Sequence, residues 1–522
     1  MNGDRRIGDR CPFPADYRAS GVLLHVTSLP SRFGIGDVGP SALAWIDRLH
    51  DAGQRWWQAL PVGPTGYGDS PYQALSSFAG NGLFLSPDWL VEDGLLRASD
   101  CEGHLFSATA VDYGSVIGFK QAMLETVYAR FSSGERPDLE VAFEQFCHEH
   151  ADWLVDYALF QALKAAHDGA GYLEWPAELV QREPGALARA RAELRQTIDR
   201  ICLAQFLLFR QGRRLKEYAH AKNVRLIGDL PFFVSADSSD VWANPDFFLL
   251  DERRRPRLVA GVPPDYYSVD GQLWGNPVYD WDALRHTGYR WCIERLRALL
   301  AHVDIVRLDH FRAFAAAWHV PADAATARSG EWLPGPGADF FYAVQRELNG
   351  LPFIAEDLGS ITPDVIALLD EFNFPGSRVL QFAFDGHPEN PHLPDNYAVN
   401  TVVYTGTHDN PTTRGWFDEL PDEQCQLVWS CLKRPEGERG QIAWELTRLA
   451  WSSRAALAIV PLQDLLNVGK EGRMNEPGRA EGNWRWRVTD EMLSRSVFHD
   501  LGRLTETAGR LRGSVAPPDT TA

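Results

Sequence analysis

The stretch VDIVRLDHF (303–311) indicates how this chain folds. It is nearly continuously apolar and then closes on three polar residues, Arg307, Asp309 and His310. A run of this kind is typical of a parallel strand that is buried on both faces. Seven other segments share this character: GVLLHV (21–26), RWWQALPV (55–62), VRLIGDLPFF (224–233), PFIAEDL (352–358), RVLQFAF (378–384), TVVYTGTHD (401–409) and LAIVPLQDL (457–465).

Amphipathic helices are predicted between several of these strands. In 361–372 (ITPDVIALLDEF), Thr362 is the expected N-cap, Pro363 occupies the first helical position, and apolar residues then recur at helical spacing. The segments 289–300 and 340–348 have the same spacing. Alternation of strands and helices predicts a parallel sheet, and eight such units predict closure into an α/β TIM (β/α)8 barrel.

Two long segments depart from the simple repeat. Residues 87–200 are rich in Ala, Glu and Arg, which predicts a mainly helical insertion, and residues 234–285 are dense in Pro, Gly, Asp and aromatics, which predicts a loop-rich insertion on the barrel. We expect both to belong to one catalytic barrel unit spanning 19–511. Residues 1–18 and the tail 512–522 are predicted to be disordered, from their composition and position.

The bulk composition argues against several classes of partner. The net charge of −19 disfavours nucleic acid and anionic membranes. No apolar run reaches the length needed to span a bilayer, and the first 20 residues contain no apolar core of a secretory signal. The seven cysteines are scattered, without a C-x-x-C pair, which favours free thiols in a reducing compartment. The sequence therefore predicts a cytoplasmic protein.

Acidic residues cluster at the ends of the predicted strands. In a TIM barrel these carboxyl ends meet at one mouth, where active sites form. Each acid alone also fits a structural ion pair or a helix N-cap, and we expect this role first for Asp357 and Asp229. Together they favour an active site. The residues at strand ends are Asp229, Arg307, Asp309, His310, Glu356, Asp357, His408 and Asp409.

Paired carboxylates predict glycoside chemistry. One carboxylate attacks the anomeric carbon and the other protonates the leaving oxygen, so their pKa values must differ. Arg307 precedes Asp309 by two residues and so shares its strand face, where it is expected to hold Asp309 ionised, as suits a nucleophile. Glu356 lacks an adjacent cation in the sequence, which suits an acid/base. A metal site is the competing interpretation, disfavoured because no H-E-x-x-H or tight Asp/His cluster is present.

Eight motifs, in order over nearly the whole chain, resemble one known family. The chain is similar to the 4-α-glucanotransferases called amylomaltases or disproportionating enzymes, which are related to the α-amylase clan. The motifs are GVLLHVTSLPSRFGIGD (21–37), GDSPYQALSSFAGN (68–81), GDLPFFVSADSSDVW (228–242), GVPPDYYSVDGQLWGNPVYDW (261–281), VRLDHFRAF (306–314), IAEDLG (354–359), YTGTHDN (404–410) and GRMNEPGRAEGNWRWR (472–487).

The resemblance implies a role for each matching residue. Asp309 matches the family's nucleophile, Glu356 its acid/base and Asp409 the acid that stabilises the transition state. Segment 261–268 matches a lid over the cleft, and Tyr72 an aromatic that stacks on the donor sugar. The residues implied in substrate binding are Ser70, Tyr72, Asp229, Asp265, Tyr266, Gln272, Trp274, Arg307, His310, His408 and Asn475.

The activity implied is transfer of α-1,4-glucan segments by a retaining double displacement, with no cofactor and no metal. Donors are expected to be α-1,4-glucans, and acceptors maltooligosaccharides or glucose. Departures from the usual motifs, at Pro411, Gly472 and 479–481, bear on acceptor preference and leave the catalytic acids unchanged. Three alternatives remain: an α-1,4-glucan hydrolase of amylase type, a glucan-binding protein without activity, and a metal-dependent barrel enzyme.

Overall fold

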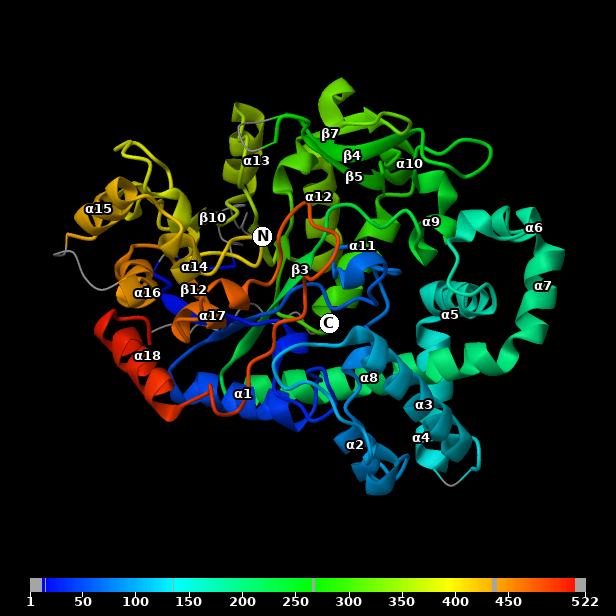
Figure 1. Ribbon diagram of the computed structural model, residues 1–522. Coiled ribbons are helices and arrows are strands. Elements are labelled where there is room, and N and C mark those ends of the chain that lie inside the picture. The colour runs from blue at the N-terminus through cyan, green and yellow to red at the C-terminus, as the bar shows by residue number, and fades with distance from the viewer. Residues whose placement is uncertain (1–11, 15, 135, 265–267, 434–438, 512–522) are drawn as a thin grey trace, which may run out of the picture.

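The computed structural model describes residues 12–14, 16–134, 136–264, 268–433 and 439–511. At its centre eight strands form a closed barrel of parallel pairs (Figure 1), and each strand overlaps one of the eight predicted segments. The TIM barrel prediction is therefore confirmed. Around the ring, the strands are β1 (Ala19–Leu23), β12 (Leu457–Pro461), β11 (Thr401–Tyr404), β10 (Gly376–Val379), β9 (Phe353–Ala355), β6 (Ile305–Leu308), β3 (Arg225–Leu230) and β2 (Trp56–Gln58).

The strand register brings the polar strand ends to one level. In the β3–β6 pair, Asp229 lies directly opposite Arg307. In the β6–β9 pair, Leu308 lies opposite Ala355, so that Asp309 and Glu356 follow at matching positions beyond the two strands. Because the strands are parallel, both acids leave the barrel on the same side.

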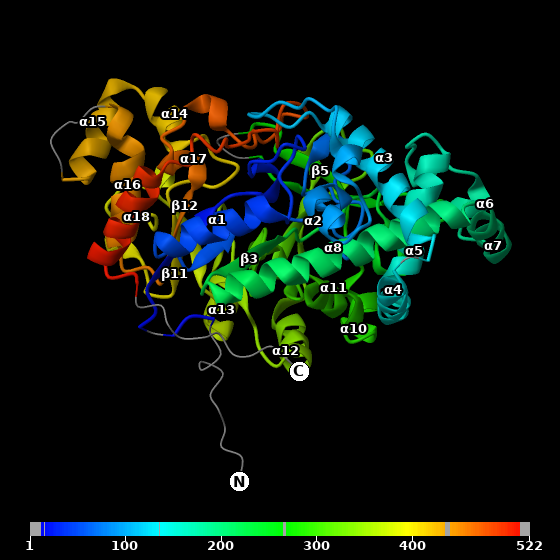
Figure 2. The ribbon, with the colours of Figure 1, turned by 90° about the horizontal axis from the view of Figure 1, so that it is seen from below.

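Amphipathic helices cover the outside of the barrel. In α13, Val365, Leu368 and Phe372 are buried and Thr362 occupies the predicted N-cap position, although its side chain makes no capping bond. Seen from below (Figure 2), α1 and the long helix α8 run beside each other across the barrel. The covering helices are α1 (Pro40–Asp51), α8 (Arg195–Ala221), α11 (Arg290–Leu300), α12 (Gly337–Leu348), α13 (Pro363–Phe372), α16 (Ile442–Ser452) and α18 (Arg495–Thr507).

Residues 87–200 form a helical projection between β2 and β3. It extends to one side of the barrel in Figure 1 and ends in α8, which leads back to β3. Helix α5 packs along α8 and also contacts α9 (Ser239–Ala243). The helices of the projection are α2 (Pro87–Glu92), α3 (Tyr113–Phe131), α4 (Pro137–Glu149), α5 (Ala151–Ala166), α6 (Ala177–Val180) and α7 (Pro184–Glu193).

A second, antiparallel sheet lies above the barrel in Figure 1. Two of its strands come from 234–285, a segment that the sequence predicts to be loop-rich. The alternation is weak there because β5 buries only its last two residues and a glycine interrupts each strand. In order, the strands are β5 (Gln272–Pro277), β4 (Leu258–Val262), β7 (Ala316–Pro321) and β8 (Glu331–Pro334).

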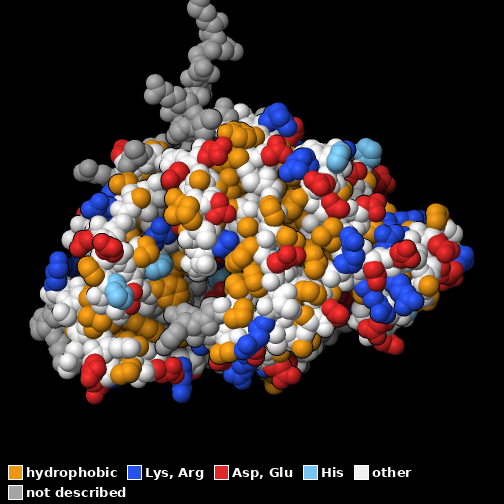
Figure 3. All heavy atoms as spheres, turned by 90° about the horizontal axis from the view of Figure 1, so that it is seen from above, with side chains coloured by type: hydrophobic (Ala, Val, Ile, Leu, Met, Phe, Trp, Pro, Cys, Tyr) orange, Lys and Arg blue, Asp and Glu red, His pale blue; other side chains and the backbone are white. Residues whose placement is uncertain are grey.

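The remaining short helices lie on the connections. Helix α10 (Trp281–His286) precedes α11, and α14 (Thr413–Asp418) and α15 (Asp422–Cys431) follow β11. Helix α17 (Leu462–Leu465) follows β12 directly. Among the described helices, none combines the length and the apolar character that crossing a bilayer requires. On the face shown in Figure 3, acidic and basic side chains are interspersed.

The described part of 1–18 is packed onto the barrel, so the prediction of disorder is wrong there. Phe13 and Tyr17 are buried and their rings stack with centroids 5.0 Å apart. The hydroxyl of Tyr17 accepts a hydrogen bond of 2.7 Å from the indole N–H of Trp56. The segment is anchored by two aromatic rings in an otherwise polar stretch. The average composition of the segment does not reveal this contribution of single residues.

The first and last barrel strands are joined by a buried arginine beyond α18. Arg510 has no exposed surface, and its guanidinium donates to the carbonyl oxygens of Ala19 at 2.9 Å and Ala455 at 3.0 Å. It also donates to the carbonyls of Trp451 and Ser453 at the end of α16. Arg510 therefore connects the entry to β1 with the entry to β12.

Candidate active site

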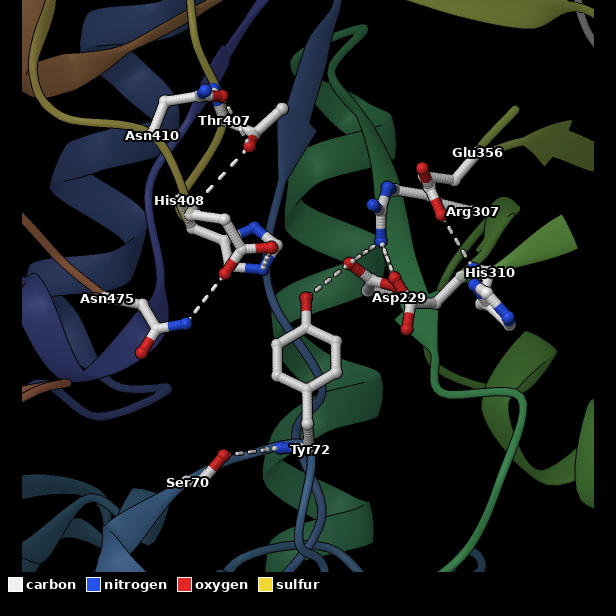
Figure 4. Close-up of polar contacts among 12 residues, drawn as sticks. Ser70, Tyr72, Asp229, Arg307, His310, Glu356, Thr407, His408, Asn410 and Asn475 are labelled. Atoms are coloured by element: carbon white, nitrogen blue, oxygen red, sulfur yellow. Dashed lines mark hydrogen bonds and ion pairs between the residues drawn. The ribbon is translucent and has the colours of Figure 1, made fainter. Parts of the chain in front are cut away.

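The acidic strand ends converge on one side of the barrel, as Figure 4 shows. Strands β3 and β6 contribute Asp229 and Arg307, and the residues that follow β6, β9 and β11 contribute Asp309, Glu356 and the pair His408–Asp409. A loop after β2 brings Tyr72 into the same space. The arrangement matches the position of active sites in TIM barrels.

A single nitrogen of Arg307 contacts two carboxylates. Its Nη1 lies 2.9 and 2.7 Å from the two oxygens of Asp229 and 2.9 Å from Oδ1 of Asp309. Asp229 has no exposed side-chain surface, and Arg307 exposes 6% of its side chain, whereas Asp309 exposes 27%. Asp309 is therefore the carboxylate of this group that is open to a substrate, and Asp229 holds the arginine from behind.

Tyr72 connects this group to His408. Its hydroxyl donates a hydrogen bond of 2.8 Å to Asp229, and its ring stacks on the His408 imidazole at 5.1 Å and 13°. Burial and the charge of Asp229 raise the pKa of Tyr72 well above its usual value, so the phenol keeps its proton. Trp484 packs at an angle against both rings, with centroids 5.9 and 6.0 Å away. Together the three rings form an aromatic wall beside Asp309.

Glu356 is held by backbone donors. The N–H of His310 donates to Oε2 at 2.7 Å, and the N–H of Leu358 donates to Oε1 at 3.1 Å. His310 adopts a left-handed conformation, with φ of 50°, which turns this N–H toward the carboxyl. Burial raises the pKa of Glu356 to about 8, although the charge of Arg307 acts in the opposite direction. The group is therefore protonated at neutral pH, as a general acid must be.

Asp409 has the opposite electrostatic environment. Its Oδ2 lies 3.3 Å from Nε2 of His408, and its Oδ1 accepts a hydrogen bond of 2.7 Å from the Asn475 amide. Burial alone raises the pKa of Asp409, but His408, Asn475 and Arg307 outweigh it, and the pKa lies well below its ordinary value. Asp409 is therefore an anion where Glu356 is an acid.

The loop that carries His408 and Asp409 is fixed at both ends by one buried acid. Asp464, in α17, accepts hydrogen bonds of 2.6 Å from the hydroxyls of Thr405 and Thr413 and one of 2.7 Å from the N–H of Thr413. Thr405 follows β11, and Thr413 begins α14. Helix α17, which follows β12, thus sets the position of the loop through Asp464.

The second sheet supplies the far side of the site. The Trp274 ring lies edge-on to the His310 imidazole at 4.9 Å, and its N–H donates to Gln272 at 3.1 Å. The predicted residues Asp265 and Tyr266 lie outside the described residues. Strand β5 thus brings Trp274 against His310, with Gln272 bonded to the Trp274 ring.

Two of the residues predicted to bind substrate make contacts within the protein. Asp229 is fully enclosed by Arg307 and Tyr72, because a buried carboxylate needs these partners, and it leaves no surface for a sugar. The hydroxyl of Ser70 accepts from the backbone N–H of Tyr72 at 3.3 Å and so shapes the turn under that ring. Asp357 pairs with Arg378 at 2.8 Å, the structural role expected from the sequence.

Two residues of the site were not predicted as such. Trp484 lies in the quoted motif GNWRWR, and its packing against Tyr72 depends on a contact between distant segments. Asp464 ends the predicted strand segment 457–465 and had no distinguishing neighbour in the sequence. Within the described residues, no group of three or more His, Cys, Asp or Glu side chains is arranged to hold a metal ion.

Comparisons with known proteins agree with this geometry. Residues 24–493 match the 4-alpha-glucanotransferase family. The chain is 50% identical to a 4-alpha-glucanotransferase of Synechocystis, over 95% of this chain and 98% of that one, and 45% identical to one of Thermus thermophilus, over 95% and 99%. The structure of an amylomaltase from Streptococcus agalactiae in complex with acarbose superposes with a TM-score of 0.91 at 37% identity, covering 94% of this chain and 99% of that one. The chain therefore belongs to the 4-alpha-glucanotransferase family.

Proposed function

We propose that this chain transfers α-1,4-glucan segments between maltooligosaccharides or starch- and glycogen-type glucans by a retaining double displacement. The observation that carries the proposal is an arginine-paired carboxylate, Asp309, at the same barrel end as a carboxyl, Glu356, whose pKa is raised to about 8. A nucleophile and a proton donor are the two groups that this mechanism requires. Membership of the 4-alpha-glucanotransferase family supports transfer over the hydrolase alternative.

In the first step, Asp309 attacks C1 of an α-1,4-linked glucose while Glu356 donates its proton to the departing glycosidic oxygen. The C1–O bond breaks, a C1–Asp309 ester forms, and the shortened glucan leaves with the proton. Arg307 and Asp229 keep the nucleophile in place. Asp409, an anion, stabilises the positive charge that develops on the sugar ring.

In the second step, the 4-hydroxyl of another glucan enters. Glu356, now a carboxylate, takes its proton, and the oxygen attacks C1 and displaces Asp309. One α-1,4 bond is broken and one is formed, so chains are redistributed with little net change in bond energy. Trp274, whose ring contacts His310, and Gln272, which is bonded to it, are the residues we assign to the acceptor.

The proposed acceptors are maltooligosaccharides and glucose, and the proposed location is the cytoplasm. The thiols of Cys101, Cys147, Cys202, Cys292 and Cys431 form no disulfide, which supports a reducing compartment. The half-buried ring of Tyr72, packed against His408 and Trp484, supports a sugar donor, since flat rings stack on the apolar faces of sugars.

Incubation of the purified protein with maltotriose tests the proposal. The expected products, separated by chromatography, are a ladder of longer and shorter maltooligosaccharides plus glucose, absent in Asp309→Asn and Glu356→Gln. Maltose and glucose without longer chains would establish the hydrolase instead. An inert protein, with longer donors also unchanged, would leave only glucan binding.

A further inference from the structure

A groove separate from the catalytic cleft lies between the helical projection and the barrel. Its volume is about 760 Å³, within the range of small-molecule sites. Helices α5 and α8 form one side, α9 and α11 form the other, and the segment 76–78 after β2 closes the inner end. In Figure 1, α5 and α11 flank this region below α9. The groove exists because the insertion folds back against the barrel.

Aromatic rings line the inner part of the groove. The Phe78 ring stacks with the Trp153 ring at 6.3 Å and 15°, and it meets the Trp291 ring edge-on at 6.0 Å. Trp153 and Phe78 are half-buried, so their rings retain exposed surface. Trp291 also lines the groove, and its buried indole N–H has no acceptor among the described residues. Rings of this kind stack on sugar faces.

Many of the charges around the groove are compensated within the protein. Asp156 pairs with Arg182 at 2.9 Å, and Asp152 on α5 pairs with Arg290 on α11 at 3.5 Å, across the groove. Burial lowers the pKa of His302 to about 4, so this imidazole is neutral and both donates and accepts hydrogen bonds. Paired charges and neutral polar groups suit an uncharged, hydroxyl-rich ligand better than an ion.

The groove lies next to the donor side of the active site. A smaller cavity of about 60 Å³ shares Phe78, Ala298 and His302 with the groove, and Tyr72 and Asp229 line its other wall. Only five residues of chain separate Tyr72, in the aromatic wall of the active site, from Phe78, in the groove. A long glucan bound in the groove is thereby held close to the catalytic cleft.

We propose that the groove between α5 and α11 is a second binding site for α-1,4-glucan chains, which holds long substrates while a different part of the same chain reacts. The choice of ligand rests on the proposed function, because the enzyme's own substrate is neutral and hydroxyl-rich. Short donors such as maltotriose are consumed in the active cleft and do not need the groove. The site therefore raises efficiency for long glucans by increasing their local concentration.

Substrates of different length distinguish the contribution of the groove to activity from that of the active site. The rate constant kcat/KM is measured for long amylose and for maltotriose with wild type, Trp153→Ala and Trp153→Phe. Removing the Trp153 ring lowers the ratio of the amylose value to the maltotriose value about tenfold, and phenylalanine restores most of it. Ala298→Gln, which fills the groove from α11 and leaves the rings intact, lowers the same ratio. Tyr342→Ala, which removes an exposed ring on α12, leaves the ratio unchanged.

Native gel electrophoresis through amylose measures binding without catalysis. Amylose retards the wild type, and the retardation decreases in Trp153→Ala and Ala298→Gln but not in Tyr342→Ala. An unchanged ratio and unchanged retardation in both groove variants overturn the inference, as does an equal loss on both substrates. If the wild type fails to redistribute maltotriose but its retardation still depends on Trp153, the proposed function falls and the groove assignment stands.

Discussion

The Nη1 of Arg307 lies 2.9 Å from Oδ1 of Asp309, two residues further along the chain. The contact forms because Arg307 is the last residue but one of β6, and Asp309, two residues further on, lies on the same side of the backbone. Since the same nitrogen also binds both oxygens of Asp229, the position of the nucleophile depends on a carboxylate in the neighbouring strand. Catalysis at Asp309 is thus tied to the β3–β6 register.

Replacing Arg307 by lysine tests this dependence. A point charge on a flexible stem does not reproduce the guanidinium contact to both Asp229 and Asp309, so we expect kcat/KM on maltotriose to fall by about 10² or more. Asp229 keeps the Tyr72 hydroxyl but loses the guanidinium in a fully buried position, and the free energy of unfolding falls by about 3–5 kcal/mol. Denaturant unfolding and initial rates measure the two effects. A variant of near wild-type stability and rate would show that the contact is dispensable.

The pH dependence of kcat/KM reports on Glu356. The pKa of this carboxyl is raised to about 8, so it is protonated below that pH and loses its proton above it. A general acid works only when protonated, so kcat/KM falls as pH rises through about 8, by roughly tenfold for each further unit. The low pKa of Asp409 keeps that group ionised throughout. An alkaline limb that begins only above pH 10 would exclude Glu356 as the titrating acid.

Tyr72→Phe and Tyr72→Ala separate the two contacts of this residue. Phenylalanine keeps the ring on His408 but removes the donor to Asp229, which costs about 1–3 kcal/mol of stability. Alanine also removes the stacking surface, so we expect its kcat/KM to be about tenfold lower than that of the phenylalanine variant. Equal rates for the two variants would mean that the ring does not contact the substrate.

Asp464→Ala tests whether Asp464 positions the loop that carries His408 and Asp409. Three donors from Thr405 and Thr413 lose their acceptor, at a cost of roughly 3 kcal/mol. Because Asp409 acts in the transition state, kcat falls and KM changes little. Asp464→Asn, which keeps one acceptor oxygen, gives an intermediate kcat. If the folded alanine variant retains full kcat, the loop is positioned by its other contacts.

Phe13→Ala tests the packing of the N-terminal segment on the barrel. The ring is 3% exposed and contacts Tyr17 and Trp56, so its removal lowers the free energy of unfolding by about 3–5 kcal/mol. The activity of the folded variant is unchanged, since the ring lies far from the acids in sequence and at the opposite end of β2 from the loop of Tyr72. Thermal unfolding followed by circular dichroism measures the effect. No change in stability would contradict the burial.

The barrel was predictable because its strands are buried on both faces and therefore apolar without interruption. The agreement is closest where a polar cluster marks the strand end, as in 303–311, and poorest for 378–384. There the observed strand is Gly376–Val379, because residues 380–382 turn into a 3-10 helix at the rim. The antiparallel sheet was missed, since exposed β5 carries little apolar signal.

For the site, the sequence indicates which acids lie at the barrel mouth but not how exposed each side chain is. Asp229 and Asp309 both lie in predicted strand segments, yet one is enclosed and the other is accessible. The difference arises because Tyr72 and Arg307 reach Asp229 from other elements. The support of Asp464 for the Thr405 segment arises only when β11 and β12 are neighbours in the ring. Such contacts depend on closure of the barrel and have no local signature.

The buried guanidinium of Arg510 has a consequence for how the molecule is made. It joins the backbone just before β12 to the backbone at the start of β1, and these are the strands whose pairing completes the ring. During synthesis, β1 leaves the ribosome before the other barrel strands. One of its edges then stays unpaired until β12, and after it Arg510, have been synthesised. A nascent chain halted before residue 457 is therefore an open sheet, and protease resistance appears only once the last connection is translated.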